Sequence, residues 1–344
     1  MELKPIANPP NPWHSTEVEY LDGEPPGARL EVYEDHTRNI LAENDSPDLG
    51  FRFTVNPYRG CFHACAYCYA RPSHEYLGLG AGTDFDRKIT VKPRAADLLR
   101  EAFEKPSWQG ELILFSGVTD CYQPLEASYR LTRACLEVCA DYRNPVGVIT
   151  KAPLVERDLD VLLRLHEVAK LRVTISIPIM DREAAHAIEP YVATPERRLK
   201  TIERLAAAGL DVGINVAPLI PGVSDDDLGE LLERAAAAGA RHANYVFLRL
   251  PGSVKQVFES RLRVALPLRA DKVLGRVREA RGGKLYDARF GVRGRGEGPL
   301  ADAVAALFDA KVKKLGLNTG GTHLGDGAST FRRPPKPGAQ LRLW

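Results

Sequence analysis

Three cysteines stand close together in this sequence, at Cys61, Cys65 and Cys68, in a C-x3-C-x2-C spacing. The loop that carries them follows an alternating run, Phe51 to Asn56, whose period of two predicts a β-strand. Three thiolates in one short loop can converge on a single inorganic centre, but a closed zinc or iron–sulfur site uses four protein ligands. A four-iron cluster held by three cysteines leaves one iron open for another ligand. The spacing therefore predicts a reactive metal centre at a strand end.

Two other interpretations of these cysteines are open from the residues alone. Either His63 or His74 would complete a zinc site with the three thiols, or the cysteines are reduced thiols that share no ligand. Cys135 and Cys139 are four residues apart on one face of a predicted helix. There we expect them to be buried as small apolar side chains.

Length and composition indicate a globular protein without a membrane-spanning part. The 344 residues suit one large domain or two ordinary ones, and 44% hydrophobic with 27% charged residues is ordinary for a soluble chain. No apolar run approaches the roughly 20 residues of a membrane helix, and residues 1–13 are polar and proline-rich, with no signal-peptide core. We expect a cytoplasmic protein with no membrane partner, in a reducing compartment that suits an oxygen-sensitive cluster.

The charge is unevenly distributed along the chain. The net charge is only +2, yet residues 251–344 contain 19 Lys and Arg against 8 Asp and Glu, whereas residues 1–250 contain 28 against 37. A basic C-terminal segment of this kind is a candidate nucleic-acid surface. A solvated basic tail without a partner explains the same charge, so both interpretations are kept.

Beyond the cysteine loop, strands and helices are predicted to alternate. Five further apolar runs have the length of a strand: residues 112–115, 146–149, 173–177, 212–216 and 245–248. Amphipathic helices are predicted after Pro93, at about 125–140, 159–165 and 194–209, and from Ser224 to Gly239. This alternation predicts a parallel sheet with right-handed crossovers. The pattern alone fits both an open doubly wound sheet and a barrel.

Three regions are predicted along the chain. Residues 1–50 are an irregular N-terminal extension, residues 51–250 form the α/β core, and residues 251–344 form a helical and basic segment. Helices are expected in the last region at about 254–264, 270–280 and 299–314. The Gly- and Pro-rich end, from Thr319 onward, is expected to be poorly ordered.

Small and polar residues follow the predicted strands, where a parallel α/β fold places its chemistry. They are Ser116, Gly117 and Thr119 after the second strand, Lys151 after the third, Ser176 in the fourth and Ala217 after the fifth. Small residues let the backbone approach a ligand, and a lysine pairs with a carboxylate. Turns between strands and helices are polar in most proteins, so the composition of any one turn is also explained without a ligand.

The cysteine spacing together with Tyr67 resembles the signature of radical S-adenosylmethionine (SAM) enzymes. In that family three cysteines bind a 4Fe–4S cluster, and the amino and carboxylate groups of SAM chelate the fourth iron. Further segments are similar to the branch related to spore photoproduct lyase, whose members are often labelled DNA repair photolyase-like: residues 56–61, 119–126, 150–151, 189–190, 198–199 and 217–222. The resemblance covers about residues 52–250. It implies the partial (β/α)6 TIM-type barrel of the radical SAM core.

The resemblance also implies roles for residues of this chain. Cys61, Cys65 and Cys68 become ligands of a 4Fe–4S cluster, and SAM becomes the second cofactor. The other positions become contacts to SAM: Tyr67 near the adenine, Ser116, Gly117 and Thr119 at the amino group, Lys151 at the carboxylate or ribose, Ser176 at the ribose, and Ala217 at the adenine through its backbone. An electron donor such as flavodoxin or ferredoxin is the implied protein partner.

The chain departs from the spore lyase at one place. The lyase has a hydrogen-donating cysteine in a stretch that matches residues 117–119 here, whereas the nearest cysteine in this chain is Cys121. Cys121 is either a substitute donor or a cysteine without a role, and no catalytic residue is assigned.

We expect reductive cleavage of SAM to a 5′-deoxyadenosyl radical, which abstracts a hydrogen atom from a substrate such as nucleic acid, as in lyase-like DNA repair. The alternatives are a radical SAM enzyme that acts on a small molecule or a protein, and a non-catalytic metal-binding module that holds nucleic acid.

Overall fold

The computed structural model describes residues 29–319 and 324–335. Its centre is a sheet in which six parallel strands are hydrogen-bonded in chain order: β3 (Phe53–Val55), β6 (Ile113–Phe115), β7 (Val146–Thr150), β8 (Leu171–Ser176), β9 (Val212–Leu219) and β10 (His242–Phe247). A doubly wound sheet reverses its strand order at a switch point, and this sheet does not. The partial (β/α)6 barrel is therefore confirmed. Within the described ranges β10 does not pair with β3, so the barrel is open on that side.

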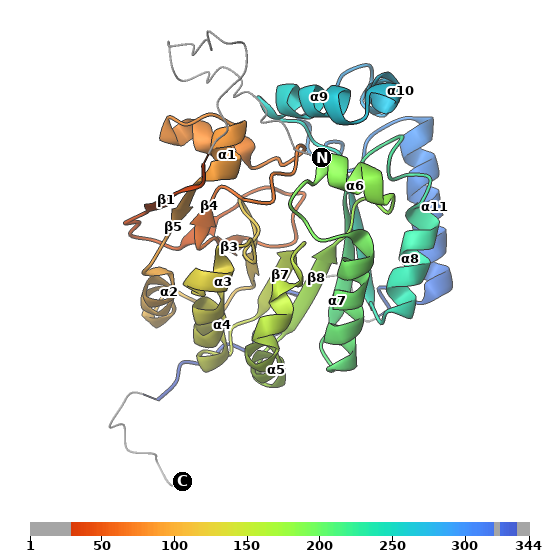
Figure 1. Ribbon diagram of the computed structural model, residues 1–344. Helices are drawn as coiled ribbons and strands as arrows, with labels where there is room; N and C mark the ends of the chain where they lie inside the picture. Colours follow the sequence, from red (N-terminus) through yellow and green to blue (C-terminus); the bar gives the residue numbers. More distant parts are fainter. Residues whose placement is uncertain (1–28, 320–323, 336–344) are drawn as a thin grey trace.

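Helices surround the outer face of the sheet (Figure 1). They are α2 (Ala95–Glu104), α4 (Leu131–Asp141), α5 (Leu159–Val168), α7 (Pro195–Ala207), α8 (Leu228–Ala237) and α11 (Pro299–Leu315). Each turns an apolar stripe to the strands, whose valines and isoleucines are buried, and together they form one core. α7 shows how such a helix starts, because Thr194 caps it and Pro195 occupies its first turn.

The carboxyl ends of the strands lie at the upper end of the barrel in Figure 1. There α6 (Arg182–Ile188) follows β8, and α9 (Val254–Ala265) and α10 (Pro267–Glu279) follow β10. This end carries the candidate site. No helix in the described ranges is both long and apolar enough to span a bilayer.

The N-terminal part contains strands that the sequence did not predict. β1 (Glu31–Glu34) pairs with β5 (Lys88–Val91), which also pairs with β4 (Tyr58–Arg59) to make a small second sheet. β2 (Leu41–Glu43) adds to the edge of β3 in antiparallel orientation. The extension is thus not irregular over these residues, and residues 1–28 lie outside the described part. Every residue of β1 is exposed, so no apolar alternation marks it in the sequence.

Two predicted helix boundaries are wrong. Ser224 does not start a helix, because its hydroxyl accepts a hydrogen bond from the Ile220 amide and closes a turn, and α8 begins only at Leu228. The helix predicted at 125–140 is divided into α3 (Glu126–Tyr129) and α4 by Arg130, whose φ of 53° is left-handed.

Residues 324–335, which we call the C-terminal strap, pack under the opposite end of the barrel. Phe331 stacks on Tyr142, and Arg333 donates to the carbonyl oxygens of Phe103 and Lys105 at the end of α2. The strap lay within the segment expected to be poorly ordered, but its aromatic and arginine side chains fix it here. Residues 336–344 lie outside the described part.

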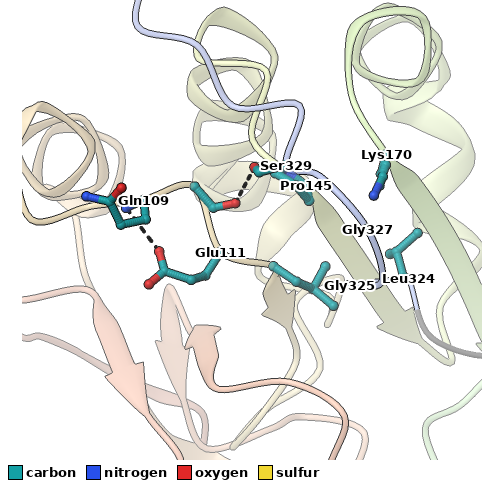
Figure 2. A pocket seen from close by; sticks show the side chains of 10 residues that line it. Gln109, Glu111, Pro145, Lys170, Leu324, Gly325, Gly327 and Ser329 are labelled. Atoms are coloured by element: carbon teal, nitrogen blue, oxygen red, sulfur yellow. Dashed lines mark hydrogen bonds between the residues drawn. The ribbon is translucent and has the colours of Figure 1, made fainter.

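Figure 2 shows the cavity between the strap and the amino ends of β6 and β8. Its volume is about 210 Å³, and Glu111, Lys170 and Leu324 are among the residues that line it. The Lys170 ammonium donates to the Asp326 carbonyl at 2.6 Å, so its charge is already directed at the strap. The cavity therefore lies at the amino ends of the strands and is separate from the candidate site.

Candidate functional site

The cysteine loop, residues 60–69, follows β4 at the upper end of the barrel. Cys61 and Cys65 are buried, Cys68 is half-buried, and all three are free thiols. The loop folds back on itself at Ala64, whose backbone amide donates to the Cys61 carbonyl and whose φ is 54°. The three cysteines thus lie in one compact loop, and their role as cluster ligands stays a prediction.

A buried arginine holds the middle of this loop. Arg71 is fully buried and donates twice to the Cys65 carbonyl, at 3.1 and 2.9 Å. It also donates to the carboxylate of Asp86 at 2.8 Å. Burial raises the pKa of Asp86 to about 6, although Arg71 opposes this shift. Arg71 therefore fixes the backbone between the second and third cysteines.

The start of the loop is held from the turn that follows β6. The carbonyl of Gly60 accepts from Thr119 Oγ1 at 2.6 Å and from Gln123 Nε2 at 3.1 Å, and Gln123 Oε1 accepts from the Phe62 amide. Gly60 has a φ of 77°, and a Cβ there would lie 2.9 Å from the carbonyl oxygen of Phe85. These bonds give Thr119 a positioning role, and its predicted contact with the amino group of SAM stays a prediction.

The β6 turn has an unusual backbone at Ser116. Its φ is 85°, which costs free energy in any residue other than glycine. Asn56 holds the turn by accepting from the amides of Gly117 and Val118 at 2.8 and 2.9 Å. The Tyr69 hydroxyl donates to the Gly117 carbonyl at 2.8 Å, so the turn touches the cysteine loop. Gly117 therefore contacts the cysteine loop through Tyr69, and the predicted contact of Ser116 and Gly117 with the amino group of SAM stays a prediction.

Asp120 ties the ends of β6 and β7 to the loop. Its carboxylate accepts from the Thr150 hydroxyl at 2.6 Å and from the Lys151 amide at 2.8 Å, and it lies 3.4 Å from His63 Nδ1. Burial alone would raise the pKa of Asp120, but His63 and these donors hold it at about 2. Burial would lower the pKa of His63, but Cys61 and Asp120 raise it to about 10. Asp120 is thus ionised and fixes the position of Lys151.

A buried chain of polar groups joins the loop to β8. The Tyr67 hydroxyl donates to Glu189, whose other oxygen accepts from Arg198 at 2.6 Å, and Arg198 donates to the Ser176 carbonyl at 2.9 Å. All four residues are buried. Burial alone would raise the pKa of Glu189, but Arg198, Lys151 and Tyr67 hold it below its usual value. Two predicted SAM contacts, Tyr67 and Lys151, therefore act on the Glu189 carboxylate directly, and a third, Ser176, is joined to it through Arg198.

The Lys151 ammonium forms no ion pair among the described residues, although its charge acts on Glu189. It lies 5.7 Å from the centre of the Tyr67 ring, and its charge lowers the pKa values of Cys65 and Cys68. Burial has the larger, opposite effect and raises the pKa of Cys68 to about 11. Thiolates here need further positive charge, which iron ions supply, and Lys151 is free to meet a carboxylate. By residue type, three thiols and one cation suit a cluster with SAM beside it, although the three side chains are not arranged around a metal ion among the described residues.

The two histidines named as zinc ligands have other partners. His74 donates to the Lys88 carbonyl at 2.9 Å and packs edge-on against Phe85, and His63 faces Asp120. In the described ranges no group of three or more His, Cys, Asp or Glu side chains is arranged to hold a metal ion.

Two remaining sequence predictions concern Cys121 and Ala217. Cys121 is fully buried in the main core, and its amide donates to Ser116 Oγ, so its thiol points away from solvent. Ala217 lies on β9, two residues beyond Asn215, which is in register with Ser176. No contact joins Ala217 to the cysteine loop in the hydrogen bonds of the described part.

Several residues that shape the site were not predicted. Glu189 and Arg198 stood in segments that carried the family resemblance, and that signal pointed to them without giving a role. Asp120 and Gln123 also stood in such a segment, residues 119–126, without a role, whereas Arg71 gave no signal, because its partners include carbonyls that the sequence does not place.

Comparison with known proteins adds family information to this geometry. A family model described as the radical SAM superfamily matches residues 55–235. An uncharacterised protein of Mycobacterium tuberculosis is 39% identical over 221 residues, which are 64% of this chain and 65% of that protein. A radical SAM Nα-GlyT isomerase of Pseudomonas phage M6 is 26% identical over 220 residues, 63% of this chain and 43% of the phage protein.

A solved structure has a similar fold. It is a spore photoproduct lyase variant with bound AdoMet and dinucleoside spore photoproduct, with a TM-score of 0.62 and 18% identity. The alignment covers 84% of this chain and 80% of the lyase. At this identity the similarity concerns the fold.

Proposed function

The chain belongs to the radical SAM superfamily, and from this premise we propose that it binds a 4Fe–4S cluster through Cys61, Cys65 and Cys68 and cleaves SAM reductively. When bound, the cluster supplies one electron that splits SAM into methionine and a 5′-deoxyadenosyl radical, which abstracts hydrogen from a substrate. An electron donor such as flavodoxin or ferredoxin completes the proposal. The observation that carries it is the set of three free thiols beside Lys151 at the carboxyl end of the barrel.

The protein's own groups would position the cofactors. Lys151 would pair with the carboxylate of SAM, while Asp120 holds the Lys151 backbone and Glu189 fixes Tyr67 against the adenine. Because these residues are buried or half-buried, the site would also keep water from the reacting carbon.

For the substrate we propose nucleic acid, in a reaction of the lyase type. Two observations support it: the basic composition of residues 251–344 and the fold shared with spore photoproduct lyase. A steep fall of DNA affinity with salt is the expected result. If binding to DNA is absent or ignores salt, a small molecule or a protein is the better substrate class.

The experiment that tests the chemistry is anaerobic reconstitution. We expect about four iron atoms per chain and SAM cleavage upon reduction. Cys61→Ala should lose both, whereas Cys135→Ala, which removes a buried core thiol, should keep the iron. Retention of iron and SAM cleavage by Cys61→Ala would refute the assignment. A colourless protein that binds zinc would favour the metal-binding module instead.

A further inference from the structure

Arg249, which follows β10 at the carboxyl end of the barrel, is a second cation beside the cysteine loop. Its guanidinium lies 5.7 Å from the centre of the Tyr69 ring. Its Nε is buried without a hydrogen-bond partner, and no ion pair of Arg249 is found in residues 29–319 and 324–335. Lys151 over Tyr67 and Arg249 over Tyr69 thus flank the same loop, and neither forms an ion pair among the described residues.

The neighbourhood of Arg249 increases this positive charge. Arg281 is buried and donates to the carbonyls of Leu248 and Arg293 at 2.7 and 2.8 Å, and it forms no ion pair among the described residues. Arg293 is paired with Asp48. Asp48 is thus shared between two guanidinium groups, since the charges of both Arg293 and Arg249 act on it. A half-buried charge without a partner costs free energy, and an anionic ligand would recover it.

Exposed aromatic rings accompany these arginines. Tyr69 is 51% exposed although its hydroxyl is anchored on Gly117, so its ring is held in a fixed place at the surface. Phe290 is 58% exposed, and the Arg293 guanidinium lies 4.3 Å from its centre. Alternating arginines and exposed rings suit an unpaired nucleotide strand, because phosphates meet the guanidinium groups and bases stack on the rings. Carboxylates of an acidic peptide would use only the arginines.

We propose that Arg249 binds a phosphate of a single-stranded nucleic-acid substrate and that Tyr69 stacks on the adjoining base. This inference rests on the proposed function, which it makes specific: Lys151 serves SAM, and Arg249 serves the substrate. Tyr69 directly follows Cys68 in the chain, so a strand stacked on Tyr69 would pass the proposed cluster.

The test uses reconstituted holoprotein and a fluorescein-labelled 12-nucleotide oligothymidylate, followed by fluorescence anisotropy at several salt concentrations. Arg249→Met should weaken binding about tenfold, since a hydrogen-bonded charge is lost, and should lower the log–log salt slope by about one. Arg249→Lys should retain most of the slope. The matched control is Arg164→Met, which removes an exposed arginine of α5 that is paired with Asp141 of α4. This variant should bind the oligonucleotide like the parent protein.

Each other outcome overturns the inference in a distinguishable way. Equal binding by Arg249→Met, or an equal loss in Arg164→Met, contradicts the role of Arg249. If a labelled hexaglutamate peptide binds in an Arg249-dependent manner and the oligonucleotide does not, the ligand group is a carboxylate and the phosphate assignment is wrong. Absence of iron in the parent protein contradicts the proposed function itself. If Arg249→Met does not hold iron, the oligonucleotide affinity and salt slope of Arg249→Lys are compared with those of the parent instead, and loss of the slope in Arg249→Lys contradicts the role of Arg249.

Discussion

Replacing Tyr67 by phenylalanine removes one hydroxyl, and we expect it to weaken SAM binding while the cluster stays in place. The hydroxyl donates to the buried carboxylate of Glu189, which keeps its ion pair with Arg198. A hydrogen bond to a charged group contributes roughly 1.5–3 kcal/mol, and this bounds the loss. Because SAM binding would have to order the ring at position 67 without that hydrogen bond, the dissociation constant for SAM should rise by roughly tenfold or more.

The chain contains a matched control for this change. Tyr58 also donates its hydroxyl to a buried carboxylate, that of Glu126, and both residues are buried. Glu126 accepts in addition from the Thr132 amide and pairs with Arg157, away from the predicted SAM contacts. Tyr58→Phe should therefore lower the free energy of unfolding by a similar amount and leave the SAM affinity unchanged.

The assay combines two measurements on anaerobically reconstituted protein with equal iron content. Equilibrium dialysis of labelled SAM gives the dissociation constant, and urea unfolding gives the stability. The reasoning is refuted if Tyr67→Phe binds SAM as the parent does. It is also refuted if both variants lose the same affinity, because the effect would then come from general destabilisation.

Three further predictions concern other parts of the molecule. Asp120→Asn should lower SAM affinity at unchanged iron content in a dialysis assay, because an amide cannot accept from both Thr150 and the Lys151 amide; unchanged affinity would contradict this. Burial raises the pKa of Asp86 to about 6, so the folded state binds this proton more tightly than the unfolded state does. As the pH rises from 4 to 6, the free energy of unfolding of the parent should fall by on the order of 2–3 kcal/mol relative to that of Asp86→Asn, measured in urea titrations. Parallel curves of stability against pH for the two proteins would contradict this. Arg333→Ala should lower the free energy of unfolding by about 1–2 kcal/mol, detected as a lower Tm, because hydrogen bonds to carbonyls at the end of α2 are lost. A simultaneous loss of iron would contradict the separation of the two barrel ends.

Much of the barrel was predictable because periodicity reports burial directly. β6, β7 and the first half of β9 are buried apolar runs, and the helices between the strands carry one apolar stripe each. β1 and β4 were missed for a physical reason: β1 is wholly exposed and β4 has two residues, so neither leaves a pattern. The start of α8 was misplaced because Ser224 has the composition of a cap but uses its hydroxyl in a turn.

Only the part of the candidate site whose residues lie close together in the sequence was predictable. The C-x3-C-x2-C motif gave the three thiols, which the structure places in one loop. The partners of that loop come from far along the chain: Tyr67 and Glu189 are 122 residues apart, and Thr119 and Gly60 are 59 apart. No periodicity connects such positions. The use of the Thr119 hydroxyl on a backbone carbonyl is likewise visible only in three dimensions.

The C-terminal strap has a consequence for the order in which the protein is built. Arg333 bonds to carbonyls 230 and 228 residues earlier in the chain, at Phe103 and Lys105. A ribosome must therefore finish nearly the whole polypeptide before the lower end of the barrel can be sealed, while the cysteine loop and its supports emerge much sooner. We expect a nascent chain halted before residue 324 to hold a formed upper end above an unsealed lower end. A pulse of protease during translation should then cut near α2, and this sensitivity should disappear when the strap is released.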